Sequence, residues 1–371
     1  MNEQLNQPGQ PPASPEFSAA TPPPPGGFAH RAAPEERFSF SGRGSEYFRI
    51  WIVNLLLSLV TLGIYSAWAK VRRQRYFYDN TSVAGTSFEY HGNAFAILKG
   101  RIVAFVLLAA YNFAFKSSPL IGLAIMLAFA LAVPWLIWRS LQFKLYNSSY
   151  RGIRFGFRGK AGGIYLNYLL LPVLTVFSLY LLTPFTHQRI KRYQHGESRF
   201  GTSHFSFHAS VGGFYKTYLL GLGIFFAGLI AILLLGGGAV FARGTDFDGS
   251  EFFSFGLMLF AVYVWAFMIL PLFFTLLQNL IWNNTRLGEH RFSSRMRWPR
   301  LMFIAFTNIV GIVFTLGLYT PFAQIRTLRY RIESMSLLPA GNLDEFIADN
   351  APQGSATGEG FSDLLDFDLS L

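Results

Sequence analysis

The sequence predicts an all-α integral membrane protein, and three observations lead to that fold class. Of its 371 residues, 51% are hydrophobic and only 14% are charged, about half the charged fraction of a typical soluble domain. Seven apolar stretches approach or exceed the length of about 20 residues that a helix needs to cross a bilayer. Basic residues gather at the ends of these stretches, as they do at membrane flanks. Bases spread in this way, rather than collected in one aromatic patch, argue against nucleic acid as a partner.

The seven apolar stretches define the elements of the predicted fold, with four to seven of them crossing the membrane. They are Ile50 to Trp68, Ile102 to Phe115, Pro119 to Trp138, Ile164 to Thr186, Tyr218 to Ala242, Phe252 to Trp282 and Leu301 to Ala323. Residues 1–36 precede them and are rich in Pro, Ala and Gly, which predicts a disordered tail. This tail has no apolar core of a signal peptide, so we expect the first apolar helix to act as an uncleaved membrane signal.

Residues 37–335 form the predicted polytopic domain, and residues 336–371 form a predicted acidic, disordered tail. The chain as a whole has a net charge of +11, yet eight acids and no Lys or Arg occur from Glu333 onward. Such a tail can solubilise the protein, lie against its basic face or bind a protein partner.

One stretch of sixteen residues is written three times. "TLGIYSAWAKVRRQRY" begins at Thr61, "TLGLYTPFAQIRTLRY" begins at Thr315, and a weaker copy, "SLYLLTPFTHQRIKRY", begins at Ser178. Self-similarity of this kind indicates a repeated structural unit, and we place the copies near residues 50–76, 167–193 and 304–330. The weaker copy lacks the glycine that the others have at Gly63 and Gly317.

A second recurring pattern lies in the connections. "NTSVAGTSFEY" from Asn80, "NSSYRGIRFGF" from Asn147 and "NTRLGEHRF" from Asn284 each place Asn and Ser or Thr ahead of a Gly and then an aromatic residue. The Gly supplies a turn and the alternation after it suits a short strand. We therefore expect short β-hairpins at the membrane surface.

The loop charges leave two topologies open. If all seven stretches cross, two strongly basic loops must lie outside, against the usual bias. If the second and third stretches form one crossing hairpin and the fifth and sixth another, the three repeat helices are re-entrant and bend near Gly63, Pro184 and Pro321. In either topology we expect most basic loops and the C-terminus to be cytoplasmic.

The candidate binding residues come from the three repeats. Each copy has two arginines at i and i+3, which share a helix face, followed by a tyrosine. These residues are Arg72, Arg75 and Tyr76, then Arg189, Arg192 and Tyr193, then Arg326, Arg329 and Tyr330. They either anchor a helix end at the bilayer of anionic phospholipid or bind a lipid headgroup or anionic solute between the repeats.

Two amides, Asn54 and Asn308, are the intramembrane polar candidates, either for a solute path or for helix-to-helix hydrogen bonds. The sequence has no cysteine and none of the motifs of nucleophilic, metal or nucleotide chemistry. We therefore expect a protein that is not an enzyme and that has no cofactor and no metal.

The segment from Phe38 to Arg101 closely resembles the opening of the YjgN-like family of bacterial polytopic inner-membrane proteins. The Phe-x-Phe-x-Gly start, "TLGIYSAWAKVRRQRY" and "FEYHG" carry the likeness, which extends over about residues 37–335. It implies an inner-membrane location and a domain of several helices, but no activity, because the family's function is unknown. From the residues we expect transporter-like or channel-like handling of an anionic lipid or small solute. The alternative is a non-catalytic membrane scaffold or envelope-stress component that binds a protein partner.

Overall fold

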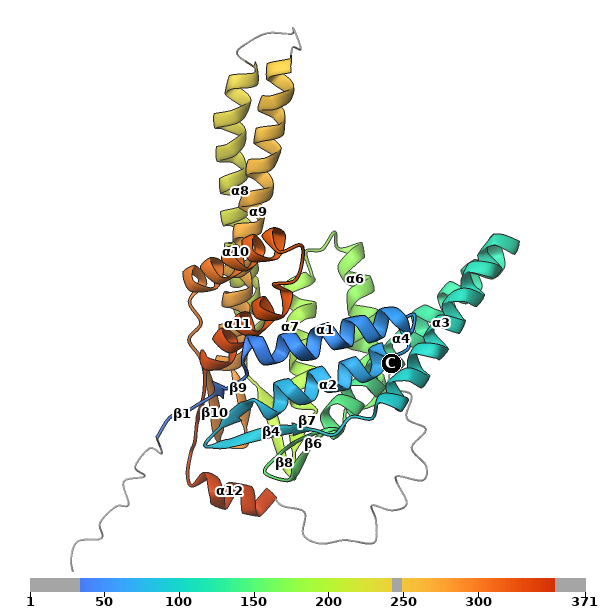
Figure 1. Cartoon of the computed structure of the whole chain (residues 1–371), viewed down its shortest axis with the longest axis vertical. Coiled ribbons are helices and arrows are strands. Elements are labelled where there is room, and N and C mark those ends of the chain that lie inside the picture. Colours follow the sequence, from blue (N-terminus) through green and yellow to red (C-terminus); the bar gives the residue numbers. More distant parts are fainter. Residues whose placement is uncertain (1–33, 242–248, 351–371) are drawn as a thin grey trace, which may run out of the picture.

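The computed structural model describes residues 34–241 and 249–350, in which helices alternate with pairs of short strands (Figure 1). The strands are β1 (Glu36–Arg37), β2 (Ser39–Phe40), β3 (Thr81–Val83), β4 (Thr86–Tyr90), β5 (Ser148–Tyr150), β6 (Ile153–Phe157), β7 (Ser198–Phe200), β8 (Ser203–Phe207), β9 (Thr285–Leu287), β10 (His290–Ser294) and β11 (Met335–Leu338). The helices are α1 (Gly44–Val60), α2 (Ser66–Asp79), α3 (Ala94–Ser117), α4 (Pro119–Tyr146), α5 (Ala161–Tyr165), the π-helical η1 (Leu166–Leu170), α6 (Leu171–Phe177), α7 (Thr183–Gly196), α8 (Val211–Phe241), α9 (Gly249–Asn283), α10 (Trp298–Phe314), α11 (Thr320–Glu333) and α12 (Leu343–Asn350).

The short strands form one antiparallel sheet that closes on itself. Each strand pairs with its neighbours in the order β1-β11-β10-β9-β8-β7-β6-β5-β4-β3-β2. The two end strands, β1 and β2, are separated only by Phe38, so they act as one strand that pairs with β11 on one side and with β3 on the other. Closure removes the exposed edges that an open sheet presents to other chains. The predicted surface hairpins are therefore parts of a small barrel, and the expectation of an all-α protein was wrong in this respect.

A ring of five phenylalanines fills the barrel. Phe38, Phe88, Phe155, Phe205 and Phe292 form a closed circuit in which neighbouring ring centroids lie 6.1 to 6.4 Å apart. Four of them come from the second strand of a strand pair, where alternate side chains point to the same face, and Phe38 lies between β1 and β2. Phe292 is buried and the other four side chains are partly buried against the same core, so the apolar surface that they remove from water helps to hold the sheet closed. The barrel has five strand pairs, although only three helical copies are recognisable in the sequence.

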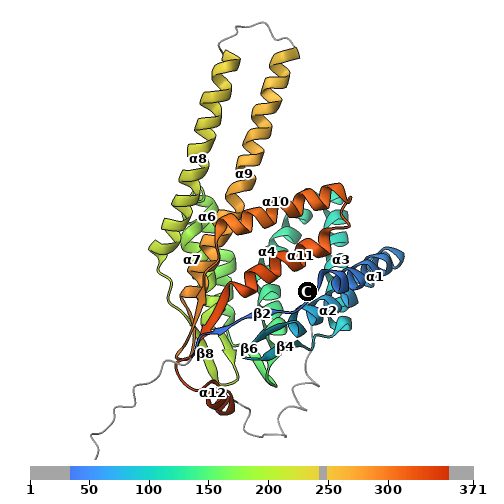
Figure 2. The same cartoon turned by 60° about the vertical axis from the view of Figure 1, so that its left-hand side comes forward.

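All the long helical elements join the barrel at one end. The turns of the strand pairs lie at the other end, so each pair of helices between them leaves and returns on the same side (Figures 1 and 2). Two helical hairpins are long, α3 with α4 and α8 with α9, and both project away from the barrel. Three are short: α1 with α2, the α5-η1-α6 segment with α7, and α10 with α11.

The short hairpins correspond to the three sequence repeats, and each breaks an apolar stretch that was predicted as one segment. Within the described residues, four helices are long and apolar enough to cross a membrane: Ala94–Lys116, Pro119–Tyr146, Val211–Gly236 and Phe252–Asn283. The remaining three apolar stretches reverse direction instead. The four-crossing alternative therefore agrees with the fold, and seven straight spans do not.

The reversal has the same construction in the first and third repeats. The Thr61 hydroxyl donates to the Leu57 carbonyl oxygen at 2.7 Å and accepts from the Tyr65 N–H at 2.9 Å. Leu62 and Gly63 then take left-handed conformations, with φ of 50° and 90°, which end the helix. The third repeat has the same bonds at Thr315 and the same conformations at Leu316 and Gly317.

The second repeat reverses without a glycine. Ser178 replaces the capping threonine and accepts from the Leu182 N–H at 3.1 Å. Tyr180 takes the left-handed position with φ of 64°, a conformation that costs a residue with a Cβ about 1–2 kcal/mol. The predicted bends at Pro184 and Pro321 are helix starts instead, because both prolines lie in the first turn of the returning helix, where proline is favoured.

Helix α12 covers the end of the barrel that carries the turns (Figure 1). Phe346 lies over His290 and Phe200, and the Asn350 Oδ1 accepts from the Thr202 hydroxyl at 2.9 Å. The prediction of a disordered tail from residue 336 is thus corrected, because residues 336–350 contain most of β11 and all of α12. Residues 351–371 of that tail and residues 1–33 of the N-terminal tail lie outside the described residues.

Candidate functional site

The tyrosines of the repeated stretch join the two ends of their own hairpins. The Tyr76 hydroxyl donates to the Arg43 carbonyl oxygen at 2.9 Å and accepts from the Arg43 N–H at 2.8 Å. Arg43 immediately precedes α1, and the contact spans 33 residues. The same separation recurs for Tyr193 with Lys160 and for Tyr330 with Arg297. All three tyrosines therefore close a helical hairpin at its base.

The predicted arginine pairs do not meet around one centre. Arg72 and Arg75 are exposed on α2, where Arg72 donates to the Tyr65 hydroxyl at 3.1 Å. Arg189 and Arg192 line a cavity of about 730 Å³ beside α7. The first pair lines neither this cavity nor the one that the third pair lines, so the repeats do not form a common arginine cluster.

The third pair is used largely within the protein. Arg326 donates to the Thr307 hydroxyl at 2.7 Å, and Arg329 donates to the Gly42 carbonyl oxygen at 2.6 Å. Arg329 also lies 3.9 Å from the Glu333 carboxylate. Both arginines line a cavity of about 490 Å³ between α10 and α11. Arg326 is bonded within the protein, whereas the Nε of Arg329 is buried without a hydrogen-bond partner within the described residues.

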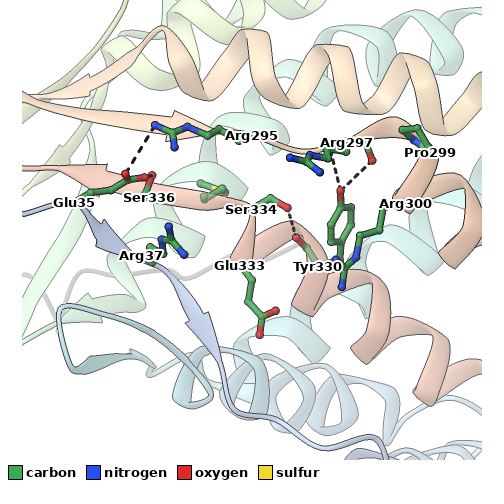
Figure 3. A pocket seen from close by; sticks show the side chains of 11 residues that line it. Glu35, Arg37, Arg295, Arg297, Pro299, Arg300, Tyr330, Glu333, Ser334 and Ser336 are labelled. Carbon is green, nitrogen blue, oxygen red and sulfur yellow. Dashed lines mark hydrogen bonds and ion pairs between the residues drawn. The ribbon is translucent and has the colours of Figure 1, made fainter.

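A neighbouring cavity of about 670 Å³ surrounds Tyr330 and is rich in arginine (Figure 3). It is lined by Arg37, Arg295, Arg297 and Arg300 together with the carboxylates of Glu35 and Glu333. Arg295 lies 3.8 Å from Glu35, and a hydrogen bond from the Ser336 hydroxyl lowers the pKa of the Glu35 carboxyl. Ionised carboxylates thus balance part of the positive charge in this cavity.

A smaller cavity in the first repeat has positive charge without such balance. It measures about 260 Å³ and lies between α1, α2, α3 and α11. Its polar lining consists of Tyr47, Asn54, Ser58, Ser66, Lys70, Arg73, Arg101 and Gln324. No carboxylate belongs to that lining in the described part of the chain. Three cations therefore face one small space with only neutral groups between them.

The cations lie close enough to affect one another. Burial, and after it the charges of Arg101, Arg73 and Lys144, lower the pKa of Lys70. Arg101 donates to the Ser66 hydroxyl, which ties α3 to the start of α2. On α2, Ser66, Lys70 and Arg73 fall at i, i+4 and i+7, so they share one helix face. Lys70 and Arg101 are half-buried and Arg73 is exposed, so solvent screens part of their repulsion, and an anion bound between them would relieve the rest.

The corresponding positions in the other repeats are neutral. A shift of 254 residues places Gln324 at the position of Lys70 and Thr327 at that of Arg73. A shift of 117 residues places His187 at the position of Lys70 and Tyr218 at that of Arg101. These two form a hydrogen bond of 2.9 Å, and burial lowers the pKa of His187 to about 4. The cation cluster is therefore a property of the first repeat alone.

Of the two predicted intramembrane amides, both are buried but only one lines the cation cavity. Asn308 is 5% exposed and donates to the Ala323 carbonyl oxygen and the Thr327 hydroxyl. Asn54 is 8% exposed and borders the cavity. Sequence reasoning singled out Asn54 but missed Lys70, Arg73 and Arg101. The signal was present in the alignment of the copies, where Lys70 and Arg73 are charges that the other repeats do not share.

Comparison with known proteins places the chain in a family. The family described as "Bacterial protein of unknown function (DUF898)" matches residues 35–364. The chain is also similar to proteins named "Inner membrane protein YjgN". It is 29% identical to that of Salmonella typhimurium strain LT2 over 144 residues, which are 38% of this chain and 36% of the relative. The relative from Escherichia coli O157:H7 is 32% identical over 149 residues, or 39% and 37% of the two chains.

The relative from Escherichia coli strain K12 is 31% identical over 149 residues, again 39% of this chain and 37% of the relative. The matched stretch thus spans little more than a third of the curated relatives. No solved structure matches the chain. The family match covers the barrel, all three repeats and both long hairpins, and it confirms the resemblance that the repeated stretch suggested. The chain belongs to the DUF898 family of bacterial proteins of unknown function, and it is similar to the YjgN inner membrane proteins.

Proposed function

We propose that this protein resides in the bacterial inner membrane and takes up a small anion, or the anionic headgroup of a lipid, in the cavity of its first repeat. The activity is transporter-like or channel-like binding and passage rather than catalysis. The single observation that carries the proposal is the cluster of Lys70, Arg73 and Arg101 around one cavity without a carboxylate in the described lining. Cations gathered without counter-charges are costly, so their presence favours a ligand that supplies the negative charge.

The size of the cavity supports a small ligand. Sites for drug-sized molecules measure about 300–1,000 Å³, whereas this cavity measures about 260 Å³. It can hold a small oxyanion or the phosphate end of a lipid, but not a whole phospholipid. The exposed apolar side chains of the α1/α2 turn, among them Val60 and Leu62 at 81% and 95% exposed, favour contact with lipid next to the cavity.

The position of the cavity supports a role at the membrane. Ser58 and Ser66 lie near the tip of the α1/α2 hairpin, and Arg101 lies on α3, one of the four helices long enough to cross. Non-helical backbone at membrane depth is tolerated only where it is surrounded by protein or water. Packing of the α1/α2 hairpin against α3 supplies such protein contacts. We propose that the barrel, its basic loops and α12 face the cytoplasm, in keeping with the bias of basic loops toward that side.

The test compares anion binding by the full-length protein in detergent and by three double variants. Lys70→Gln with Arg73→Thr installs the residues of the third repeat and should weaken the binding of inorganic phosphate about hundredfold or more, because each charge-assisted hydrogen bond contributes about 1.5–3 kcal/mol. Arg286→Gln with Arg291→Gln removes two charges from the barrel and should leave the affinity unchanged. Isothermal titration and native mass spectrometry of retained lipid measure the free and the lipid-borne ligand separately.

The third double variant, Arg72→Gln with Arg75→Gln, removes the exposed face of the same helix. Unchanged phosphate affinity in this variant supports the cavity as the binding site. The assignment is overturned if this variant loses affinity while the Lys70 and Arg73 double variant keeps normal affinity. Passage is measured as phosphate flux into liposomes that contain the protein. Binding without any flux would show that the protein holds the anion but does not move it.

A further inference from the structure

The first and third repeats differ in how one buried amide is satisfied. The Asn308 Oδ1 lies 3.5 Å from the guanidinium of Arg326, while its Nδ2 donates to two partners. At the equivalent position, the Asn54 Oδ1 is buried and has no hydrogen-bond partner within the described residues. Leaving a buried acceptor without a donor destabilises the unliganded protein. Asn54 lines the cation cavity, so this oxygen lies beside the space that a ligand would occupy.

The cause of the difference lies in one neighbouring residue. In the third repeat the Thr307 hydroxyl accepts from Arg326 and holds its guanidinium near Asn308. The equivalent of Thr307 in the first repeat is Val53, which offers no acceptor. The equivalent arginine, Arg72, bonds to the Tyr65 hydroxyl instead.

The unpartnered oxygen restricts the chemistry of the ligand. An anion that offers only acceptor oxygens satisfies Lys70, Arg73 and Arg101 but leaves the Asn54 Oδ1 without a donor. An anion that carries a hydroxyl group satisfies both, since the hydroxyl donates to Asn54 while the charged oxygens face the cations. Sites built to bond a ligand hydroxyl reject analogues that lack it, because a buried polar group is then left unpaired.

Resting on the proposed function, we infer that the ligand of the first-repeat cavity is a hydroxyl-bearing anion, either free hydrogen phosphate or a lipid headgroup with hydroxyl groups. Asn54 selects it by accepting the hydroxyl hydrogen. The cations set the affinity, and Asn54 sets the preference among anions.

The experiment measures phosphate and sulfate binding to the full-length protein in detergent near neutral pH. Phosphate retains a hydroxyl there and sulfate has none, while both are tetrahedral oxyanions. We expect phosphate to bind at least tenfold more tightly. Val53→Thr gives Arg72 the acceptor that Thr307 gives Arg326, so it should lower phosphate affinity toward that of sulfate. Asn54→Leu, with the residue of the second repeat, should do the same and leave sulfate affinity unchanged.

The lipid source is tested in nanodiscs. Phosphatidylglycerol, which has headgroup hydroxyls, is compared with phosphatidylmethanol, which has the same charge and no hydroxyl. If the protein prefers phosphatidylglycerol to phosphatidylmethanol but does not prefer phosphate to sulfate, the ligand is a lipid headgroup. If it prefers phosphate to sulfate but does not distinguish the two lipids, the ligand is the free anion. If phosphate binds as tightly as sulfate and the two lipids bind equally, the hydroxyl inference is overturned. The proposed function still stands in that case, provided that the Lys70 and Arg73 double variant loses this binding. Absence of binding to all four probes overturns the proposed function itself.

Discussion

The first and third repeats share a backbone and differ in what they enclose. Both reverse at a Thr-Leu-Gly turn with the same hydrogen bonds and the same left-handed residues, and both are closed by a tyrosine at the base. Inside, the third repeat places neutral Gln324 and Thr327 where the first places Lys70 and Arg73. The third repeat bonds its buried amide within the protein, whereas the first holds an amide oxygen without a described partner beside a cavity lined by cations.

This difference separates the residues that build the hairpin from those that give it a ligand. Among the residues that recur, the turn and the tyrosine are used for contacts within the hairpin. The three cations of the cavity, Lys70, Arg73 and Arg101, are residues that do not recur. In this protein the repeated residues build the hairpins, and the cations that are not repeated form the candidate binding site.

The largest effect on stability should come from the amide of the third repeat. Asn308→Leu removes hydrogen bonds to the Ala323 carbonyl oxygen and the Thr327 hydroxyl and should cost about 2–3 kcal/mol. Asn54→Leu should cost less than about 1 kcal/mol, because its buried oxygen has no described partner to lose. Thermal melting of the two variants in detergent measures the contrast. Equal losses would contradict the assignment of the two amides to different roles.

The tyrosine contacts at the hairpin bases should rank next. Tyr76→Phe and Tyr330→Phe each remove two hydrogen bonds to the residue before the first helix and should cost about 1–2 kcal/mol. Tyr193→Phe removes one described bond and should cost about half as much. If these variants instead keep their melting temperature and lose lipid or anion binding, the tyrosines are ligand residues, as the sequence alone suggested.

A smaller effect, this time a gain in stability, should follow from removing a positive charge from the cation cavity. Lys70→Gln removes a cation held among other cations, so in the absence of anion the variant should be more stable by an amount on the order of 1 kcal/mol. The folded state lowers the pKa of Lys70, so wild-type stability should rise as pH increases from that lowered pKa to the ordinary lysine value of about 10.4. The variant should lack this rise.

The same titration affects anion binding. A bound anion favours the charged lysine, so affinity should be complete below the pKa of Lys70 and should fall as pH rises through it. Lys70→Arg should move that fall to higher pH, because arginine stays protonated. A pH profile that is identical for the wild type and this variant would show that Lys70 does not contact the anion.

The smallest change is expected at the turn of the second repeat. Tyr180→Gly relieves a left-handed conformation at an exposed side chain and should stabilise the protein by about 0.5–1 kcal/mol. Gly63→Ala in the first repeat imposes the same strain and should destabilise by a similar amount. Melting curves of the two single variants provide the comparison, and a loss of stability in both would show that Tyr180 makes contacts beyond its conformation.

Much of the helical organisation could be predicted from the sequence, because it depends on local patterns. Apolar length defines the two long hairpins, and the Thr-Leu-Gly stretch defines the reversals at Gly63 and Gly317. Closure of the barrel could not be predicted in the same way. The five phenylalanines of its ring come from strand pairs separated by hairpins of different length, and the last pairing joins Arg37 to Ser336. No local sequence pattern predicts a contact between residues so far apart in the chain.

The candidate site was predictable only in part. Asn54 was found because a buried amide in an apolar helix is unusual. Lys70 and Arg73 were not singled out, because they lie in the same short stretch as Arg72 and Arg75 and only the latter two recur in the other copies. Arg101 lies on a different hairpin, and only the packing of α3 against α2 brings it to the cavity.

The pairing of β1 with β11 also determines the order in which the protein folds. Glu35 and Ser336 are hydrogen-bonded across 301 residues of chain, so the first strand must wait for nearly the whole domain to be synthesised. At about 5–20 residues per second this wait lasts roughly 15–60 seconds. During that interval the helical hairpins are synthesised one after another, while one side of the N-terminal strand remains unpaired. Closing the barrel is therefore the last step of assembly, and a chain interrupted before Met335 can insert its helices but cannot complete its fold.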